Sequence, residues 1–369
     1  MKGYYIHYKG RIPVGVSKKI DMMLKEFDQF SNIEEIDLTS SRCSIFRSLL
    51  AFLPFIDIKR NYKQAFACME RNHPDYIYIR RTTADKGFLR FIKQIRTEYP
   101  ACKIIVEIMS FPYDKEEFFN MIYWPYYFKE CVNRKKYKLY IDRFVTFSDD
   151  AKIFGVDTIQ TLNGIDVDGI VPVTGEKNGS TINLVAVAGM YKFHGYERLI
   201  YGLGNYYKKG GARTIVLHLV GDGPELSRYK EITQKQRLEG KVIFYGKKYG
   251  QELDEIYNKM DIAVSSLGLY KLGIDKISSL KLNEYLAKGL PIVAGCDTVA
   301  MTGKSSIYYL QFENNESPIY VDKIVDFYDN IYATSKERKE IIHDIRKLAY
   351  ETVDIKVTME GIKNYIMGE

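Results

Sequence analysis

The chain has few of the residues that build disulfide frameworks and metal sites. It contains five cysteines and five histidines in 369 residues, and no two cysteines form a C-x-x-C pair. The cysteines are Cys43, Cys68, Cys102, Cys131 and Cys296. An odd number of scattered cysteines argues against disulfides and against a zinc site, and is typical of a reduced, cytoplasmic protein. We expect neither a metal nor a bound cofactor.

The sequence also lacks a long apolar run. The longest one, residues 48–56, is interrupted by Pro54. It falls far short of the ~20 residues that a helix needs to cross a bilayer. The first eight residues, MKGYYIHY, read as a strand rather than a signal peptide. These features predict a cytoplasmic protein that does not span a membrane.

Several catalytic motifs are missing as well. The chain has no phosphate-loop lysine motif, no H-E-x-x-H and no nucleophile elbow, and His7 and His73 are isolated. The formal net charge of +7 is too small an excess to indicate a nucleic-acid partner by itself. It is equally compatible with a negatively charged membrane surface or a phosphorylated ligand. We expect no nucleic acid.

What the chain does contain is a regular alternation of short buried strands and helical patterns. The predicted strands are 4–8, 33–38, 76–80, 103–107, 144–148, 182–187, 214–220, 241–245, 262–265 and 291–295. The predicted helices are 17–30, 87–99, 196–208, 224–238, 251–259 and one that begins near residue 279. This alternation predicts an α/β fold of parallel sheets covered by helices.

A turn-rich stretch from Asn163 to Ser180 divides the two sets of strands. We predict domains at 1–162 and 163–345, followed by a polar helical tail at 346–369. Ligands of parallel sheets bind outside the carboxyl ends of the strands. Two such domains facing each other would therefore present those ends to one deep cleft. The 31 tyrosines can line such a cleft or lie half-buried in the core.

The most informative segment is residues 278–295, SSLKLNEYLAKGLPIVAG. Ser278 or Ser279 can cap a helix, which Gly289 and Pro291 would end before a buried strand. Lys281 and Glu284 would share one face near the start of that helix. There the free N–H groups and the helix dipole suit a phosphate, and the carboxylate one turn further suits a ribose diol. The alternative is a solvated helix.

Two glycine-containing loops follow predicted strands of the second half. In Gly221-Asp-Gly-Pro-Glu225, Gly221 and Gly223 allow a tight turn and close approach of a ligand to backbone N–H groups, or serve the turn alone. Lys192 in the loop at 189–195 and Arg198 just after it are candidate phosphate contacts. Arg198 can equally be an exposed charge, whereas a phosphate contact is the favoured interpretation of Lys192, and His194 can touch a ligand or only pack.

The first half offers fewer candidates. Glu107 ends a predicted strand, where a carboxylate would face the cleft, and we weigh a ligand role against a structural one. Apolar and basic residues also occur together in residues 46–63 and in residues 124–138. Such a combination can lie on an anionic membrane. A core helix beside a solvated charge run explains it as well.

With these residues in place, the chain resembles family 4 glycosyltransferases of the GT-B fold, which have two facing Rossmann-like domains. The motifs lie over about 140 residues, at 163–166, 221–224, 242–246, 261–265 and 279–293. The last is similar to a subgroup that makes bacterial surface polysaccharides. The first half resembles the family more loosely, through residues 107–117, Ser148 and the loop from Gly10 to Gly15, which would place Gly15 at the ligand.

The resemblance assigns roles to these residues. Glu284 would bind the ribose hydroxyls, and Lys281 with the N–H groups of Ser279 and Leu280 would hold the diphosphate. Lys192 would neutralise charge on the leaving group. Family members usually retain configuration at the anomeric carbon and need no metal, and the first domain would present the acceptor.

The sequence also departs from the family pattern. Lys276 stands where a donor-sugar glutamate is usual, and Met190 replaces an arginine. Even so, the expected function is transfer of a hexose from a nucleotide-diphosphate sugar to a lipid-linked or polysaccharide acceptor, at the inner face of the cell membrane. The alternatives are a sugar-nucleotide epimerase and a catalytically inactive GT-B partner subunit.

Overall fold

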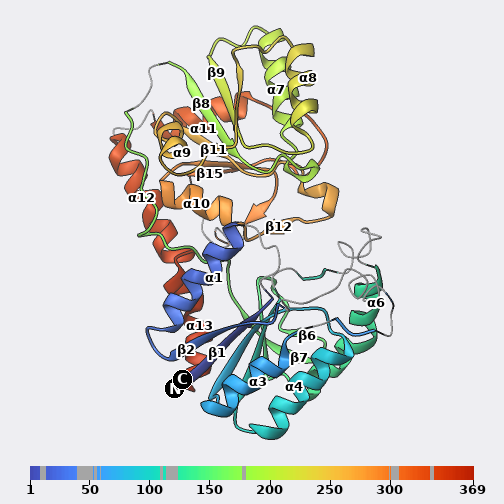
Figure 1. Cartoon of the computed structure of the whole chain (residues 1–369). Helices are drawn as coiled ribbons and strands as arrows, with labels where there is room; N and C mark the ends of the chain where they lie inside the picture. Colours follow the sequence, from blue (N-terminus) through green and yellow to red (C-terminus); the bar gives the residue numbers. More distant parts are fainter. Residues whose placement is uncertain are drawn as a thin grey trace. The chain divides into compact units, whose positions relative to one another are not determined.

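The structure is a computed structural model that describes residues 1–8, 14–39, 53, 56–58, 60–108, 111–113, 124–176, 180–298, 300, 307–332 and 336–369. The chain divides into two compact units. Unit 1 comprises Met1–Leu162 and Thr358–Glu369, and unit 2 comprises Asn163–Val357. The last helix, which we expected in a separate tail, therefore belongs largely to unit 1 (Figure 1).

Unit 1 is built on a seven-stranded sheet in the order β2-β1-β3-β4-β5-β7-β6. The strands are β1 (Lys2–His7), β2 (Asn32–Asp37), β3 (Tyr76–Arg80), β4 (Lys103–Ile108), β5 (Arg143–Thr146), β6 (Lys152–Ile153) and β7 (Val156–Gln160). Only the β6–β7 pair is antiparallel among them. β1, β3 and β4 are almost wholly buried, as expected of strands in the middle of a parallel sheet.

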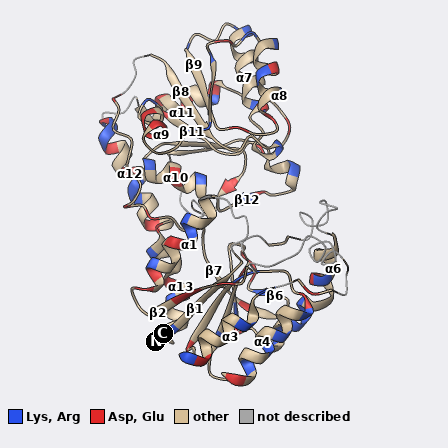
Figure 2. Ribbon diagram, in the orientation of Figure 1, with Lys and Arg blue, Asp and Glu red and all other residues tan. Residues whose placement is uncertain are grey.

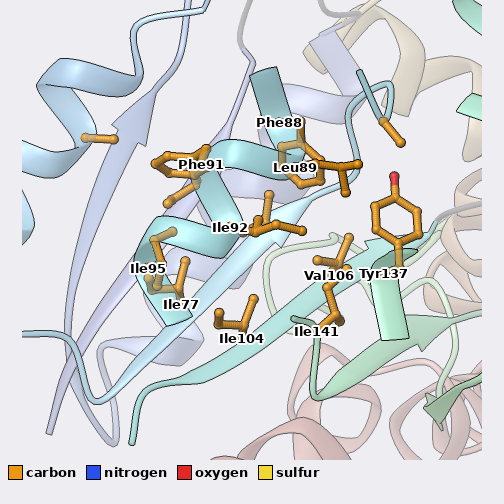
Figure 3. Close-up of a cluster of buried hydrophobic side chains, with 14 of the residues drawn as sticks. Ile77, Phe88, Leu89, Phe91, Ile92, Ile95, Ile104, Val106, Tyr137 and Ile141 are labelled. Atoms are coloured by element: carbon orange, nitrogen blue, oxygen red, sulfur yellow. The ribbon is translucent and has the colours of Figure 1, made fainter. Parts of the chain in front are cut away.

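Helices cover both faces of this sheet. They are α1 (Val14–Phe27), α3 (Tyr62–Arg71), α4 (Lys86–Glu98), α6 (Trp124–Asn133) and α13 (Ile355–Met367), with the 3₁₀ helix η2 (Arg134–Leu139). α4 begins where the Asp85 side chain accepts a hydrogen bond from the N–H of Phe88 (2.8 Å). Its apolar face, including Phe88, packs on Ile77 of β3 and on Ile104 and Val106 of β4 (Figure 3). This layer is the main core of unit 1.

Unit 2 has a six-stranded sheet in the order β10-β9-β8-β11-β13-β15, with every pair parallel. The strands are β8 (Ile182–Val187), β9 (Ile215–Val220), β10 (Val242–Gly246), β11 (Ile262–Val264), β13 (Ile292–Ala294) and β15 (Tyr309–Gln311). The chain runs outward from β8 in one direction and from β11 in the other. This order is that of a Rossmann domain, and the strand order reverses between β8 and β11.

The helices of unit 2 are α7 (Glu197–Lys208), α8 (Leu226–Lys235), α9 (Gly250–Tyr257), α10 (Leu280–Lys288), α11 (Asp322–Tyr332) and α12 (Arg338–Thr352). Two 3₁₀ helices, η3 (Lys192–His194) and η4 (Leu269–Leu272), and a short pair of strands, β12 (Lys276–Ile277) with β14 (Asp297–Thr298), complete it. The predicted α/β fold with parallel sheets and C-terminal helices is confirmed.

Two further properties bear on function. Lys, Arg, Asp and Glu are interspersed over the ribbon of each unit, as the small net charge suggests (Figure 2). Among the helices that the structure describes, none combines the length and the apolar character needed to cross a bilayer.

Candidate functional site

The carboxyl edge of the unit 2 sheet carries the candidate site. The loop after β8 (188–195) and the loop after β11 (265–268) flank the point where strand order reverses, which is where open α/β sheets bind ligands. The two loops are joined by a hydrogen bond from the N–H of Leu267 to the carbonyl of His194 (2.7 Å).

Glycines permit this approach. Gly195 has φ +64°, and a Cβ there would lie 2.5 Å from the backbone nitrogen of Gly268. A side chain at either position would drive the loops apart. Gly195 therefore lets the two loops pack together and keeps the preceding residue, His194, between them at the carboxyl edge of the sheet.

His194 is buried, and its ring has a defined proton position. Its Nδ1 accepts a hydrogen bond from the backbone N–H of Tyr191 (3.0 Å), so the proton of the neutral ring is on Nε2. Burial, followed by the nearby Lys281 ammonium, lowers the pKa of His194 to about 3. The ring is therefore neutral near pH 7, and it presents an N–H donor.

That donor faces another nitrogen. Nε2 of His194 lies 3.3 Å from Nζ of Lys281, in the first turn of α10. An ammonium cannot accept the Nε2–H, so two donors oppose each other when Lys281 is charged. An anionic oxygen beside both would accept from both. Burial lowers the pKa of Lys281 to about 8, partly offset by the carboxylate of Glu284.

The start of α10 adds further donors. Ser279, one of the two serines expected to cap the helix, is the N-cap, but its side chain makes no capping hydrogen bond. The first intrahelical bond runs from the N–H of Asn283 to the Ser279 carbonyl (3.0 Å). The N–H groups of residues 280–282 therefore precede any intrahelical acceptor, and with the helix dipole they favour an anion beside Lys281.

Other contacts fix where this helix begins. The N–H of Asn163 donates to Oγ of Ser278 (2.8 Å), and Nδ2 of Asn283 donates to the Asn163 carbonyl (2.6 Å). On the opposite side, the hydroxyl of buried Tyr285 accepts from the N–H of Val187 at the end of β8 (2.9 Å). The first turn of α10 is thereby tied to the edge of the sheet.

Glu284 lies one turn after Lys281 and is partly exposed. Its Oε1 is 3.5 Å from the hydroxyl of Tyr257. The order along α10 is thus free N–H groups, a cation and then a carboxylate. Gly289, in the left-handed conformation at φ +79°, ends the helix as the sequence predicts.

The two glycines of the 221–225 loop have an internal reason to be glycine. A Cβ on Gly221 would lie 1.9 Å from the carbonyl oxygen of Ala188, and one on Gly223 would lie 1.9 Å from that of Gly189. Both also have positive φ, at +130° and +156°. They allow the loop after β9 to pack on the loop after β8, so this packing explains the glycines without a ligand.

Arg198 and Lys192 differ sharply in environment. Arg198 is 3% exposed, and its guanidinium donates to the carbonyls of Leu267, Ser317 (2.7 Å) and Glu313 (2.9 Å). These contacts fasten the loop after β11 to the segment after β15, which favours a structural role over a phosphate contact. Lys192 is exposed at the start of η3, beside His194 in sequence.

In unit 1, Glu107 is 1% exposed and accepts a hydrogen bond from Nζ of Lys19 (2.8 Å). The Lys19 ammonium holds the pKa of this carboxyl below its ordinary value despite burial. A buried ion pair favours a structural role for Glu107.

Other predictions in unit 1 are only partly covered by the structure. Gly15 lies in the first turn of α1, where a Cβ would have no heavy atom within 4 Å, but residues 9–13 of its loop are outside the described residues. Residues 46–52 of the apolar and basic segment are likewise outside them. Arg60, which we grouped with that surface, is instead buried in an ion pair with Asp85 (3.0 Å).

His194 is the residue that sequence reasoning left undecided. One sequence feature could have identified it, because His194 precedes a glycine in the first loop of a Rossmann domain. Its partner Lys281, however, is 87 residues away in the sequence. Within the described ranges, no group of three or more His, Cys, Asp and Glu residues could hold a metal ion.

Comparison with known proteins agrees with this geometry. Residues 181–330 match the family model for glycosyl transferases group 1. No curated protein sequence matches the chain. The structure of the lipopolysaccharide outer core galactosyltransferase WaaB is similar, with a TM-score of 0.64 at 13% identity, covering 100% of this chain and 99% of that one.

Two other solved structures are similar over their whole length. A glycosyltransferase from Rickettsia africae gives a TM-score of 0.61 at 14% identity, covering 99% of this chain and 98% of that one. HepE from Anabaena, solved in complex with UDP-glucose, gives 0.60 at 13% identity, covering 99% of each. The chain thus has the GT-B fold, and its residues 181–330 match the model of the group 1 glycosyl transferases, in agreement with the motifs of its second half.

Proposed function

We propose that the protein transfers a hexose from a nucleotide-diphosphate sugar to a lipid-linked or polysaccharide acceptor, with retention at the anomeric carbon. The observation that carries the proposal is the opposed pair of donors, His194 Nε2 and Lys281 Nζ, 3.3 Å apart at the start of α10. A diphosphate oxygen is the acceptor that this pair lacks. The complex of HepE with UDP-glucose supports a sugar nucleotide as the ligand.

The reaction follows from where charge develops. When the bond between the anomeric carbon and the phosphate oxygen breaks, both electrons go to the phosphate, so negative charge grows on the diphosphate. Donors fixed in place before the reaction stabilise that charge without reorganising. We assign this role to the Lys281 ammonium, the Nε2–H of His194 and the first N–H groups of α10, so that no metal is required.

The remaining residues would position the donor. Glu284 would accept hydrogen bonds from the ribose diol, one turn beyond the diphosphate. Exposed Lys192 would add positive charge from the loop after β8. Gly221, Gly223 and Arg198 would act indirectly, by holding the loops that present these groups. Unit 1 would bind the acceptor, and the protein would act at the inner face of the cell membrane.

The test is turnover and binding with a panel of sugar nucleotides. Wild-type protein should release nucleoside diphosphate only when a suitable acceptor is present, and Lys281→Ala and Glu284→Ala should lose most of that activity. Near wild-type rates in both variants would remove the assignment. Isomerised sugar nucleotide without acceptor would identify an epimerase, and absence of donor binding would identify a non-catalytic subunit.

A further inference from the structure

The loop after β8 carries an aromatic surface that the proposed reaction does not use. Tyr191 is 51% exposed, and its ring stacks on that of Phe193, with 5.7 Å between the ring centroids and 8° between the ring planes. The centroid of the Phe193 ring lies 4.5 Å from that of His194. We call Tyr191 and Phe193 the aromatic platform. It adjoins the residue that we assign to the diphosphate.

The backbone on both sides of Tyr191 is held in place. The N–H of Tyr191 donates to Nδ1 of His194 (3.0 Å), and the N–H of His194 donates to the carbonyl of Tyr191 (2.9 Å). The preceding residue, Met190, is buried, and its carbonyl accepts from the N–H of Glu225 (2.9 Å). An exposed ring on so constrained a segment loses little conformational freedom when a ligand covers it.

The contacts of α10 indicate which part of a sugar nucleotide would reach the platform. The N–H of Val187 donates to the hydroxyl of Tyr285, beside the ribose residue Glu284, whereas His194 lies 3.3 Å from Lys281. The loop after β8 therefore runs toward the start of α10 and away from Glu284. In a sugar nucleotide the ribose and the base leave the diphosphate at one end, and the hexose leaves it at the other. The platform therefore lies toward the hexose end.

We infer that the aromatic platform binds the ring of a hexopyranose, and that Tyr191 determines specificity for it. A pyranose presents a face of C–H groups, which packs on an aromatic ring by apolar contact. A nucleobase also stacks on aromatic rings, but the ribose contact at Glu284 directs it away from Tyr191. The inference rests on the proposed function, and the pyranose is either the donor hexose or the acceptor sugar that receives it.

Calorimetry and steady-state kinetics on the full chain distinguish the two sources. The probes are the sugar nucleotide that binds wild-type protein most tightly in the panel and the nucleoside diphosphate that it contains. If the donor hexose lies on the platform, Tyr191→Ala should bind the sugar nucleotide about five- to tenfold more weakly and the nucleoside diphosphate as tightly as wild type. If the acceptor sugar lies there, both titrations should match wild type, and KM for the acceptor should rise by a similar factor.

Three further variants separate the flat ring from other properties of the side chain. Tyr191→Phe keeps the ring and removes only the hydroxyl, so it should behave like wild type. Tyr191→Leu keeps apolar bulk over Gly189, which the Tyr191 ring contacts, and should show the same loss as Tyr191→Ala. Tyr320→Ala removes another tyrosine of unit 2, 56% exposed, and should change neither binding nor turnover. Wild-type affinity for the nucleoside diphosphate shows in each variant that unit 2 is folded.

Two outcomes would overturn the inference and leave the transferase assignment intact. One is Tyr191→Ala and Tyr191→Leu matching wild type both in affinity for the sugar nucleotide and in KM for the acceptor. The other is an equal loss of affinity for the sugar nucleotide and for its nucleoside diphosphate, which would put a nucleobase on the ring. Failure of the proposed function is seen in the wild-type protein instead: if it binds no sugar nucleotide, both proposals are wrong.

Discussion

The charge of Lys281 should control donor affinity in a pH-dependent way. Its pKa, lowered to about 8 by burial, is that of the free protein. A diphosphate beside it would raise that pKa, since the anion favours the charged amine. Binding therefore takes up a proton above about pH 8 and none below it. The dissociation constant should be flat up to about pH 8 and then rise by up to tenfold per pH unit.

The magnitude follows from the shift. At about pH 9, one unit above the pKa of the free protein, roughly a tenth of the molecules carry a charged Lys281, so binding should be about tenfold weaker than at about pH 7, or about 1.4 kcal/mol. Lys281→Arg keeps its charge at both values and should show little change. Lys281→Met should lose a charged hydrogen bond, about 1.5–3 kcal/mol, at about pH 7. Since methionine does not titrate, its deficit relative to wild type should shrink by about 1.4 kcal/mol at about pH 9.

Isothermal titration calorimetry measures this pH dependence of the dissociation constant. The ligand is the nucleoside diphosphate of whichever sugar nucleotide binds most tightly in the panel described above. Ionisation of the ligand itself is common to wild type and Lys281→Arg, so the difference between their pH profiles isolates the lysine. Parallel profiles for these two proteins, or Lys281→Met binding as tightly as wild type, would refute the placement of a diphosphate at Lys281.

Four further predictions concern other candidate residues of the two units. Glu284→Gln should weaken nucleotide binding by about 1.5–3 kcal/mol through the ribose contact, and equal titrations of variant and wild type would argue against it. Gly195→Ala places a Cβ 2.5 Å from Gly268 at a positive φ, so thermal unfolding should show a loss of about 2 kcal/mol or more; an unchanged melting temperature would contradict this packing. Arg198→Met should leave buried carbonyls without a donor and cost about 2–4 kcal/mol in chemical denaturation, while the folded fraction still binds nucleotide; a stable variant that no longer binds would restore a phosphate role. Glu107→Gln should cost about 3–5 kcal/mol because it strands Lys19, and Lys19→Met/Glu107→Leu should recover stability and turnover; a stable but inactive double variant would make Glu107 catalytic.

The sequence predicted the parts of the fold whose causes are local. β8 at 182–187 and β3 at 76–80 are found at the predicted residues, because buried parallel strands are short apolar runs between turn residues. The end of α10 was predicted because Gly289 is needed in the left-handed conformation and Pro291 prevents continuation. The two-residue strands β12 and β14 were missed, since they are too short to show any period.

The role of a site residue could be predicted where it depends on residues close in sequence. It could not be predicted where it depends on a partner that is distant in sequence. Lys281 and Glu284 are three residues apart on one helix, so their shared face could be inferred. Arg198 donates to the carbonyl of Ser317, 119 residues away, and Glu107 pairs with Lys19, 88 residues away. The residues adjacent in sequence to Arg198 and Glu107 do not indicate these distant partners. From the sequence, a ligand contact therefore remained an open interpretation for both.

The helix α6 is a third case, because its buried face is polar and its exposed face is apolar. Its aromatic residues suggested either a core helix or a membrane surface, and sequence periodicity cannot tell which face of a helix is covered. The decision comes from Glu130, which is buried because Tyr113 and Tyr137 reach it from outside the helix. The apolar face is therefore the one left exposed.

The most direct test of the proposed donor site is a crystal structure with a bound nucleoside diphosphate. We predict one diphosphate oxygen within hydrogen-bonding distance of both His194 Nε2 and Lys281 Nζ, and the ribose hydroxyls on the carboxylate of Glu284. A nucleotide bound elsewhere in unit 2, with those two nitrogens still facing each other at 3.3 Å, would contradict it.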